Sequence, residues 1–135
     1  MTRTLVLFAI SLIAAGCGTT TTTSPTPTQD TATLLGEFSS QLIPGGTASR
    51  EFDVTTAGAM TVTLKSTTPA GVMVGAGVGI PRSDGSCALS AAVEAVAGAA
   101  AQLSMAAAAG PHCARVYDPG TLTAPLSFTI SISRP

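Results

Sequence analysis

Charged side chains are scarce in this sequence, which limits the partners it can bind through electrostatics. Charged residues make up 10% of the 135 residues, against roughly 25% in an average soluble domain. Lys65 is the only lysine and the arginines are scattered along the chain. A nucleic-acid-binding surface requires clustered lysine and arginine to meet the phosphates, so no nucleic-acid partner is expected.

Histidine is also scarce, which leaves one candidate for a general base of that type. Tryptophan is absent, and the one histidine, His112, adjoins Cys113. Cysteine–histidine catalysis would require that thiol to be free, so a packed or solvent-facing histidine is expected instead. Asp84 and Asp118 lie in turn sequences, where aspartate typically accepts hydrogen bonds from nearby backbone amides. No single loop supplies more than one carboxylate to the oxygen ligands that calcium needs, and the alternative is a site assembled from several loops. We expect no enzyme activity, cofactor or metal.

The first residues resemble a bacterial lipoprotein signal. Arg3 precedes an apolar run at residues 5–15, which is too short to cross a bilayer of about 30 Å. The run ends in "AAGC", the pattern of a lipobox, so residues 1–16 are expected to be removed and Cys17 to carry lipid. The alternative is an ordinary secretory signal that leaves Cys17 as a spare thiol.

The cysteine count supports lipidation. Three cysteines occur, and an odd thiol in an exported chain needs an explanation because the compartment is oxidising. Lipid on Cys17 leaves Cys87 and Cys113 to form a disulfide. In lipoproteins of two-membrane bacteria, an aspartate after the lipidated cysteine commonly retains the protein at the inner membrane. Gly18 stands there instead, which implies an outer-membrane lipoprotein facing the periplasm or the surface.

Residues 17–33 form a low-complexity linker rich in threonine and proline. This composition cannot bury enough apolar surface to become ordered. At near 3.1 Å per residue, the linker allows a stand-off of roughly 40 to 50 Å from the membrane. We therefore expect a flexible tether.

Residues 34–135 show the alternation of an all-β domain. Apolar residues recur at every second position in three segments: Met60, Val62 and Leu64; Leu126, Phe128, Ile130 and Ile132; Phe52 and Val54. Turn sequences separate such segments, which predicts an antiparallel β-sandwich over residues 34–135.

A glycine-rich run, "GVMVGAGVGIP", is also predicted to be a strand. Its apolar side chains share one face: Val72, Val74, Ala76, Val78 and Ile80. Glycine inside a strand indicates a bulge or a close backbone approach. A phosphate-binding loop is not expected, because no Lys-Ser/Thr follows the glycines.

The alanine-rich segment 88–109 is ambiguous. Helix propensity and helical spacing favour a helix, whereas residues 101–107 also alternate as a strand does. A helix of that length spans about 33 Å, and a disulfide needs Cα atoms within about 7 Å. A Cys87–Cys113 bridge therefore favours a hairpin that turns near Gly98, with the bridge joining its outer ends.

The segments "GEFSSQLIPGG", "REFDVTTAGAMTVTLKS", "GVGIP" and "HCARVYDPGTLTAPLSFTISISRP" resemble the bacterial pre-peptidase C-terminal-like domains. That resemblance implies a jelly-roll β-sandwich of a kind usually appended to secreted enzymes. No peptidase accompanies the domain in this chain.

The expected function is therefore that of a lipid-anchored, non-catalytic envelope protein with a binding or structural role. Its expected partners are the membrane, through the lipid, and an envelope protein or polysaccharide. Arg115 and Tyr117 share one strand face and form a candidate polar contact patch. The alternative is an accessory module that binds a separately encoded secreted hydrolase or its polymeric substrate.

Overall fold

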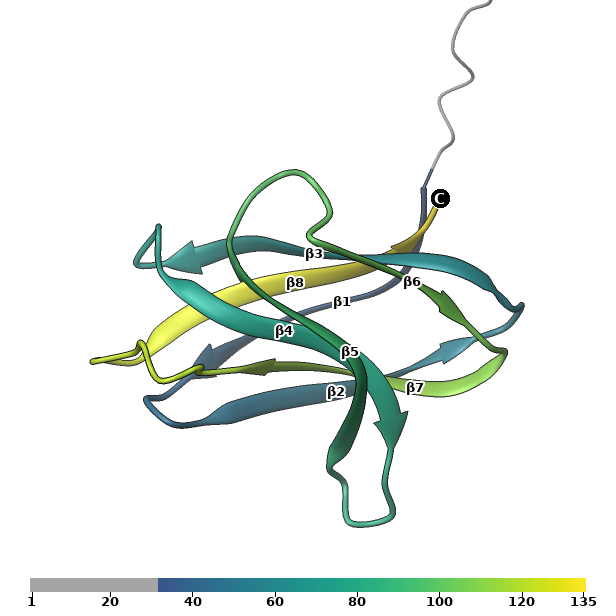
Figure 1. Cartoon of the computed structure of the whole chain (residues 1–135), viewed down its shortest axis with the longest axis horizontal. Helices are drawn as coiled ribbons and strands as arrows, with labels where there is room; N and C mark the ends of the chain where they lie inside the picture. Colours follow the sequence, from purple (N-terminus) through teal and green to yellow (C-terminus); the bar gives the residue numbers. More distant parts are fainter. Residues whose placement is uncertain (1–31) are drawn as a thin grey trace, which may run out of the picture.

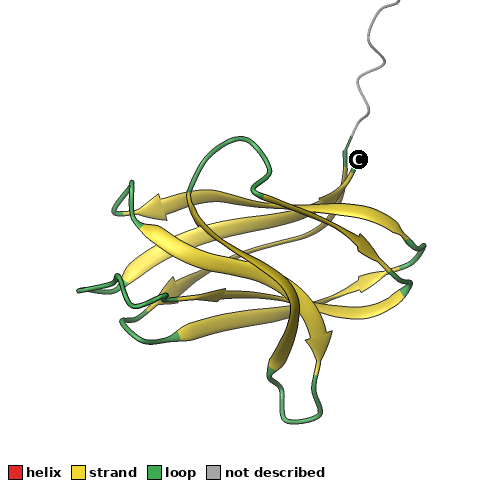
Figure 2. Ribbon diagram, in the orientation of Figure 1, coloured by secondary structure: helices red, strands yellow, loops and turns green. Residues whose placement is uncertain are grey.

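The computed structural model describes residues 32–135, which form two four-stranded antiparallel sheets packed face to face (Figure 1). The predicted signal peptide, Cys17 and nearly all of the linker lie outside these residues. The described part consists of strands and loops and contains no helix (Figure 2). The strands are β1 (Thr33–Leu42), β2 (Thr47–Val54), β3 (Gly58–Thr68), β4 (Met73–Pro81), β5 (Cys87–Val96), β6 (Leu103–Ala107), β7 (Gly110–Tyr117) and β8 (Leu126–Arg134).

The strand order is that of a jelly roll. Sheet A has the order β1-β8-β3-β6 and sheet B the order β2-β7-β4-β5. The antiparallel pairs β4–β5, β3–β6, β2–β7 and β1–β8 make the chain one long ribbon, folded so that successive pairs alternate between the sheets. The predicted all-β sandwich is confirmed, including its jelly-roll connectivity.

The core lies between the two sheets and is formed by the apolar side chains that alternate along the strands. The predicted inward residues of β3 and β8 are all buried: Met60, Val62, Leu64, Leu126, Phe128, Ile130 and Ile132. Sheet B contributes Val54, Val74, Ala76, Val78, Ala114 and Val116. The rings of Phe38 and Phe128 meet edge to face, with centroids 5.6 Å apart.

The glycine-rich run is strand β4, and the predicted close backbone approach is present at one of its glycines. Val78 pairs with Ala91 and Gly79 with Leu89, so the bulge between the two strands lies in β5, opposite these residues. A Cβ atom on Gly79 would collide with the backbone carbonyl of Ala88 in β5. Glycine at this position therefore lets β5 cross closely over β4.

One residue of this strand departs from the prediction. Ile80 was expected to face the core, but it is 50% exposed. The last pair between β4 and β7 joins Gly79 to Cys113, so Ile80 lies beyond it. There the β4–β5 hairpin projects past the body of the sandwich (Figure 1), and no opposing sheet covers the side chain.

The predicted hairpin at Gly98 is wrong, although the segment is extended and not helical. β5 pairs with β4 in sheet B, whereas β6 pairs with β3 in sheet A. The chain therefore crosses between the sheets over residues 97–102. The amide of Gly98 donates to the carbonyl of Leu64, and the side chain of Gln102 bonds both the amide (2.7 Å) and the carbonyl (3.3 Å) of Leu64.

Candidate functional site

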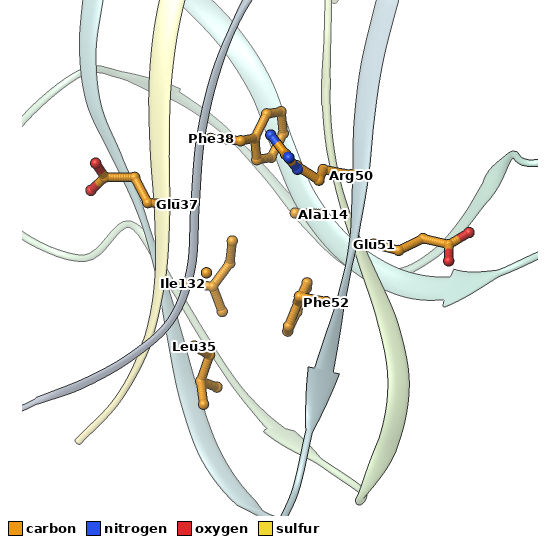
Figure 3. A pocket seen from close by; sticks show the side chains of 9 residues that line it. Leu35, Glu37, Phe38, Arg50, Glu51, Phe52, Ala114 and Ile132 are labelled. Carbon is orange, nitrogen blue, oxygen red and sulfur yellow. The ribbon is translucent and has the colours of Figure 1, made fainter.

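A cavity of about 160 Å³ opens between β1 and β2, the adjacent edge strands of the two sheets (Figure 3). Its wall combines apolar side chains with three charged residues at the rim. The apolar lining is Leu35, Gly36, Phe38, Phe52, Ala114 and Ile132, and the charged residues are Glu37, Arg50 and Glu51. The cavity reaches from the surface into the layer between the sheets.

A bulge in β1 shapes one wall of this cavity. Leu34 pairs with Ser133 and Gly36 with Ile132, so Leu35 is an extra residue without a partner in β8. A bulge re-aims side chains, and here Leu35 packs against the core instead of pointing outward as Glu37 does. At Gly36 a Cβ atom would lie 3.5 Å from that of Phe52, so the two edge strands approach each other there.

Arg50 of β2 lies on the inward-facing side of the alternation but is exposed at the open edge of the sandwich. Ala48 and Phe52 pack against the core and Val54 is buried, so the alternation places Arg50 on the same face. Figure 3 shows its side chain extending from β2 toward the cavity, in the direction of Phe38. Arg50 was not singled out by the sequence analysis, although an arginine within an apolar alternation was the available signal.

The two glutamates at the rim point away from the cavity (Figure 3). Glu37 is engaged elsewhere, since the Lys65 ammonium lies 3.1 Å from its carboxylate. This is the one ion pair among residues 32–135. Within that part of the chain, the Arg50 guanidinium has no carboxylate partner and is available to an anion.

The predicted disulfide between Cys87 and Cys113 is present, with the Cα atoms 5.8 Å apart. It joins the start of β5 to β7, not the ends of a hairpin. The neighbouring His112 is buried, its Nδ1 lies 3.0 Å from the carbonyl oxygen of Gly110, and its ring packs at a tilt against Phe52. Cys113 therefore offers no free thiol to this histidine.

Asp118 is the turn carboxylate that the sequence predicts. One of its oxygens accepts the amide of Gly45 at 2.7 Å, and the other accepts the amides of Gly120, Thr121 and Leu122. The hydrogen bond from Gly45, supported by the other three, lowers the pKa of Asp118 below its ordinary 3.8, against a smaller opposing effect of desolvation. The carboxylate thus ties the β1–β2 turn to the β7–β8 loop.

Asp84 also accepts hydrogen bonds as a turn carboxylate, but only within the β4–β5 turn. It accepts the hydroxyl of Ser86 at 2.6 Å and the amide of Ser86 at 2.9 Å. The hydroxyl hydrogen bond is the main cause that lowers the pKa of Asp84. Both aspartates are therefore occupied in local structure.

Arg115 and Tyr117 lie side by side on the outer face of sheet B, as predicted. The guanidinium carbon of Arg115 is 5.9 Å from the centre of the Tyr117 ring. The ring also lies across Gly75 of β4, since a Cβ atom there would collide with it. Tyr117 therefore covers the glycine face of the sheet as well as contributing to a surface patch.

The outer face of sheet A carries mainly hydroxyl groups. Cross-strand pairs join Ser39 to Thr129, Gln41 to Ser127, Ser66 to Thr129 and Thr68 to Ser127. The hydroxyls of Ser39 and Thr129 are 2.7 Å apart and bond each other. A shallow depression runs over this neutral, hydrogen-bonding surface.

No metal-ligand cluster of three or more histidine, cysteine, aspartate or glutamate side chains occurs in residues 32–135. Over the same residues, no helix has the length and apolar character needed to span a membrane.

No protein-family model, curated protein or solved structure matches this chain. The resemblance to pre-peptidase C-terminal-like domains therefore stays a prediction. A β-sandwich hosts many unrelated functions, so function has to be inferred from the site and not from the fold.

Proposed function

We propose that this chain is a lipid-anchored, non-catalytic protein of the bacterial cell envelope with a binding or structural role. The observation that carries the proposal is the Cys87–Cys113 disulfide. Structural disulfides form and persist in oxidising compartments, which supports export. The bridge engages two of the three cysteines in the sequence, and Cys17 stands in the lipobox-like "AAGC".

The positions of the reactive side chains support a role without catalysis. His112 is buried against Phe52, and its neighbour Cys113 is part of the disulfide. Asp84 accepts hydrogen bonds from the amide and hydroxyl of Ser86 in its own turn, and Asp118 accepts backbone amides of its own loop and of the β1–β2 turn. These four residues are each engaged in structure, which leaves none of them free for acid–base or nucleophilic chemistry.

The anchor follows from lipid chemistry. By the resemblance, Cys17 carries a diacylglyceryl thioether and an amide-linked acyl chain. Because each buried methylene contributes about 0.8 kcal/mol, several acyl chains hold a protein on a membrane essentially permanently. The hydroxyl-covered face of sheet A favours a neutral, hydrogen-bonding partner such as an envelope polysaccharide over a charged one.

Metabolic labelling with a palmitate analogue tests the proposal. The wild-type protein is expected to carry the label and to sediment with membranes, whereas Cys17→Ser is expected to be unlabelled. The matched control is the double variant Cys87→Ser/Cys113→Ser, which keeps Cys17 and is expected to stay labelled. A Cys17→Ser protein that remains labelled and membrane-bound would overturn the proposal.

A pull-down of the intact anchored protein separates this function from the alternative. Recovery of envelope components supports the proposed role. Recovery of one secreted hydrolase would instead favour an accessory module for that enzyme.

A further inference from the structure

The cavity between β1 and β2 has the size and lining of a site for one small apolar group. A cavity of about 150 Å³ lined by leucine, isoleucine and phenylalanine is known to accept benzene. The present cavity is about 160 Å³ and is open to solvent; Leu35, Phe38, Phe52 and Ile132 form its apolar part, beside the charged residues at its rim. Its apolar part therefore fits a ring or chain of about six carbon atoms.

The charged side chain at the cavity determines which polar group a ligand should carry next to its apolar part. Arg50 is the one charged side chain that extends toward the cavity, while Glu37 and Glu51 point away (Figure 3). A guanidinium presents a planar fork of donors that matches the two oxygens of a carboxylate. Since Glu51 also stands at the rim, a single negative charge fits better than a phosphate dianion or a dicarboxylate.

We propose that this cavity binds a small apolar monocarboxylate, with its hydrocarbon part between Phe38, Phe52 and Ile132 and its carboxylate against Arg50. The ligand class deepens the proposed binding role and rests on it. The bulge at Leu35 is part of the site, because it turns an additional apolar side chain into the wall.

A titration with hexanoate tests the proposal directly. The full chain carrying Cys17→Ser is used, so that no acyl chain competes for the cavity. Methyl NMR signals of Leu35, Ala114 and Ile132 are expected to shift, whereas those of Val74 and Val78, which do not line the cavity, stay unchanged. Affinity should rise about fourfold for each methylene from propionate to hexanoate and then level off as the cavity fills.

Charge selectivity is tested with hexanamide and hexylamine. Hexanamide is expected to bind more weakly than hexanoate, and protonated hexylamine more weakly still. Arg50→Gln should weaken hexanoate about 1.4- to fivefold, the range for an exposed ion pair, and weaken hexanamide less. Arg82→Gln is the matched control, because Arg82 lies near the β4–β5 turn and does not line the cavity.

Three results would overturn the proposal: no methyl shifts at tens of millimolar hexanoate, equal binding of hexylamine and hexanoate, or unchanged selectivity in Arg50→Gln. Because the titration uses Cys17→Ser, its failure leaves the lipid-labelling result untouched. Conversely, a failed labelling experiment does not alter the titration, so the two proposals fail separately.

Discussion

Removal of the disulfide is expected to cost this domain a large part of its stability. The perturbation is the double variant Cys87→Ala/Cys113→Ala, made in the Cys17→Ser chain so that unfolding can be followed in solution. The bridge joins β5 to β7, which are separated in sheet B by β4. Without the bridge, no covalent bond holds β5 in its close approach to Gly79 of β4.

The magnitude follows from the length of chain that the bridge closes. The two cysteines are 26 residues apart. The chain-entropy expression for a loop of that length gives about 3.5 kcal/mol at 25 °C. Native domains are stable by roughly 5–15 kcal/mol, so the variant should remain folded at a much reduced margin.

Urea unfolding followed by far-ultraviolet circular dichroism measures the effect. With a denaturant dependence of about 1–3 kcal/mol per molar, the midpoint should fall by about 1 to 3.5 M. The unsubstituted pair in the presence of reductant serves as the control and should lose a similar amount. The reasoning would be refuted if the double variant lost less than about 1 kcal/mol of unfolding free energy, or if reductant left the urea midpoint of the protein with both cysteines unchanged.

Three further predictions concern strand crossing, the turn carboxylate and the core. Gly79→Ala should lower the unfolding midpoint and the yield of disulfide more than Gly75→Ala. A Cβ atom at Gly79 would meet a backbone carbonyl, whereas one at Gly75 would meet only the end of the Tyr117 side chain. Equal effects of the two substitutions would contradict this prediction. Because the native pKa of Asp118 is lowered, its carboxylate stabilises the fold above about pH 3.8, and this stability is lost as the pH falls through the native pKa. Asp118→Asn should therefore have a lower free energy of unfolding than the wild-type protein at pH 7, and that free energy should fall less on acidification. Ile130→Ala, at a fully buried position, should cost about 2–5 kcal/mol in urea unfolding, and a cost below 1 kcal/mol would contradict its place in the core.

Local alternation was enough to predict strands β2, β3 and β8 and their inward-facing residues. Met60, Leu64 and Phe128 were assigned inward from period-two spacing alone, and all are buried. The disulfide followed from the number of cysteines and the expected compartment. These features depend on near neighbours in sequence or on simple counting, which is why one sequence suffices.

The pairing of distant strands could not be predicted in the same way. The periodicity around Gly98 is ambiguous, and the geometry of the Cys87–Cys113 bridge correctly favours extended chain. Neither contains anything about which sheet each half joins. β5 and β6 separate because their partners β4 and β3 lie in different sheets. Ile80 was misplaced for a related reason, since its exposure depends on where the opposing sheet ends.

The cavity was missed because it arises between elements. It depends on the bulge that re-aims Leu35 and on the separation of two edge strands. Arg50 appeared as an ordinary charge in "REFDV", and only its alternation with Phe52 and Val54 indicated an inward position. Its place at the cavity depends on β1 and β2 lying next to each other, which local alternation does not indicate.

The division of the three cysteines between one lipid anchor and one disulfide is tested most directly by the intact mass of the mature protein. The expected mass is that of a chain beginning at Cys17 with a diacylglyceryl group and one further acyl chain, heavier by two hydrogen atoms after unfolding and reduction. An unmodified amino terminus, or a mass that reduction leaves unchanged, would contradict it.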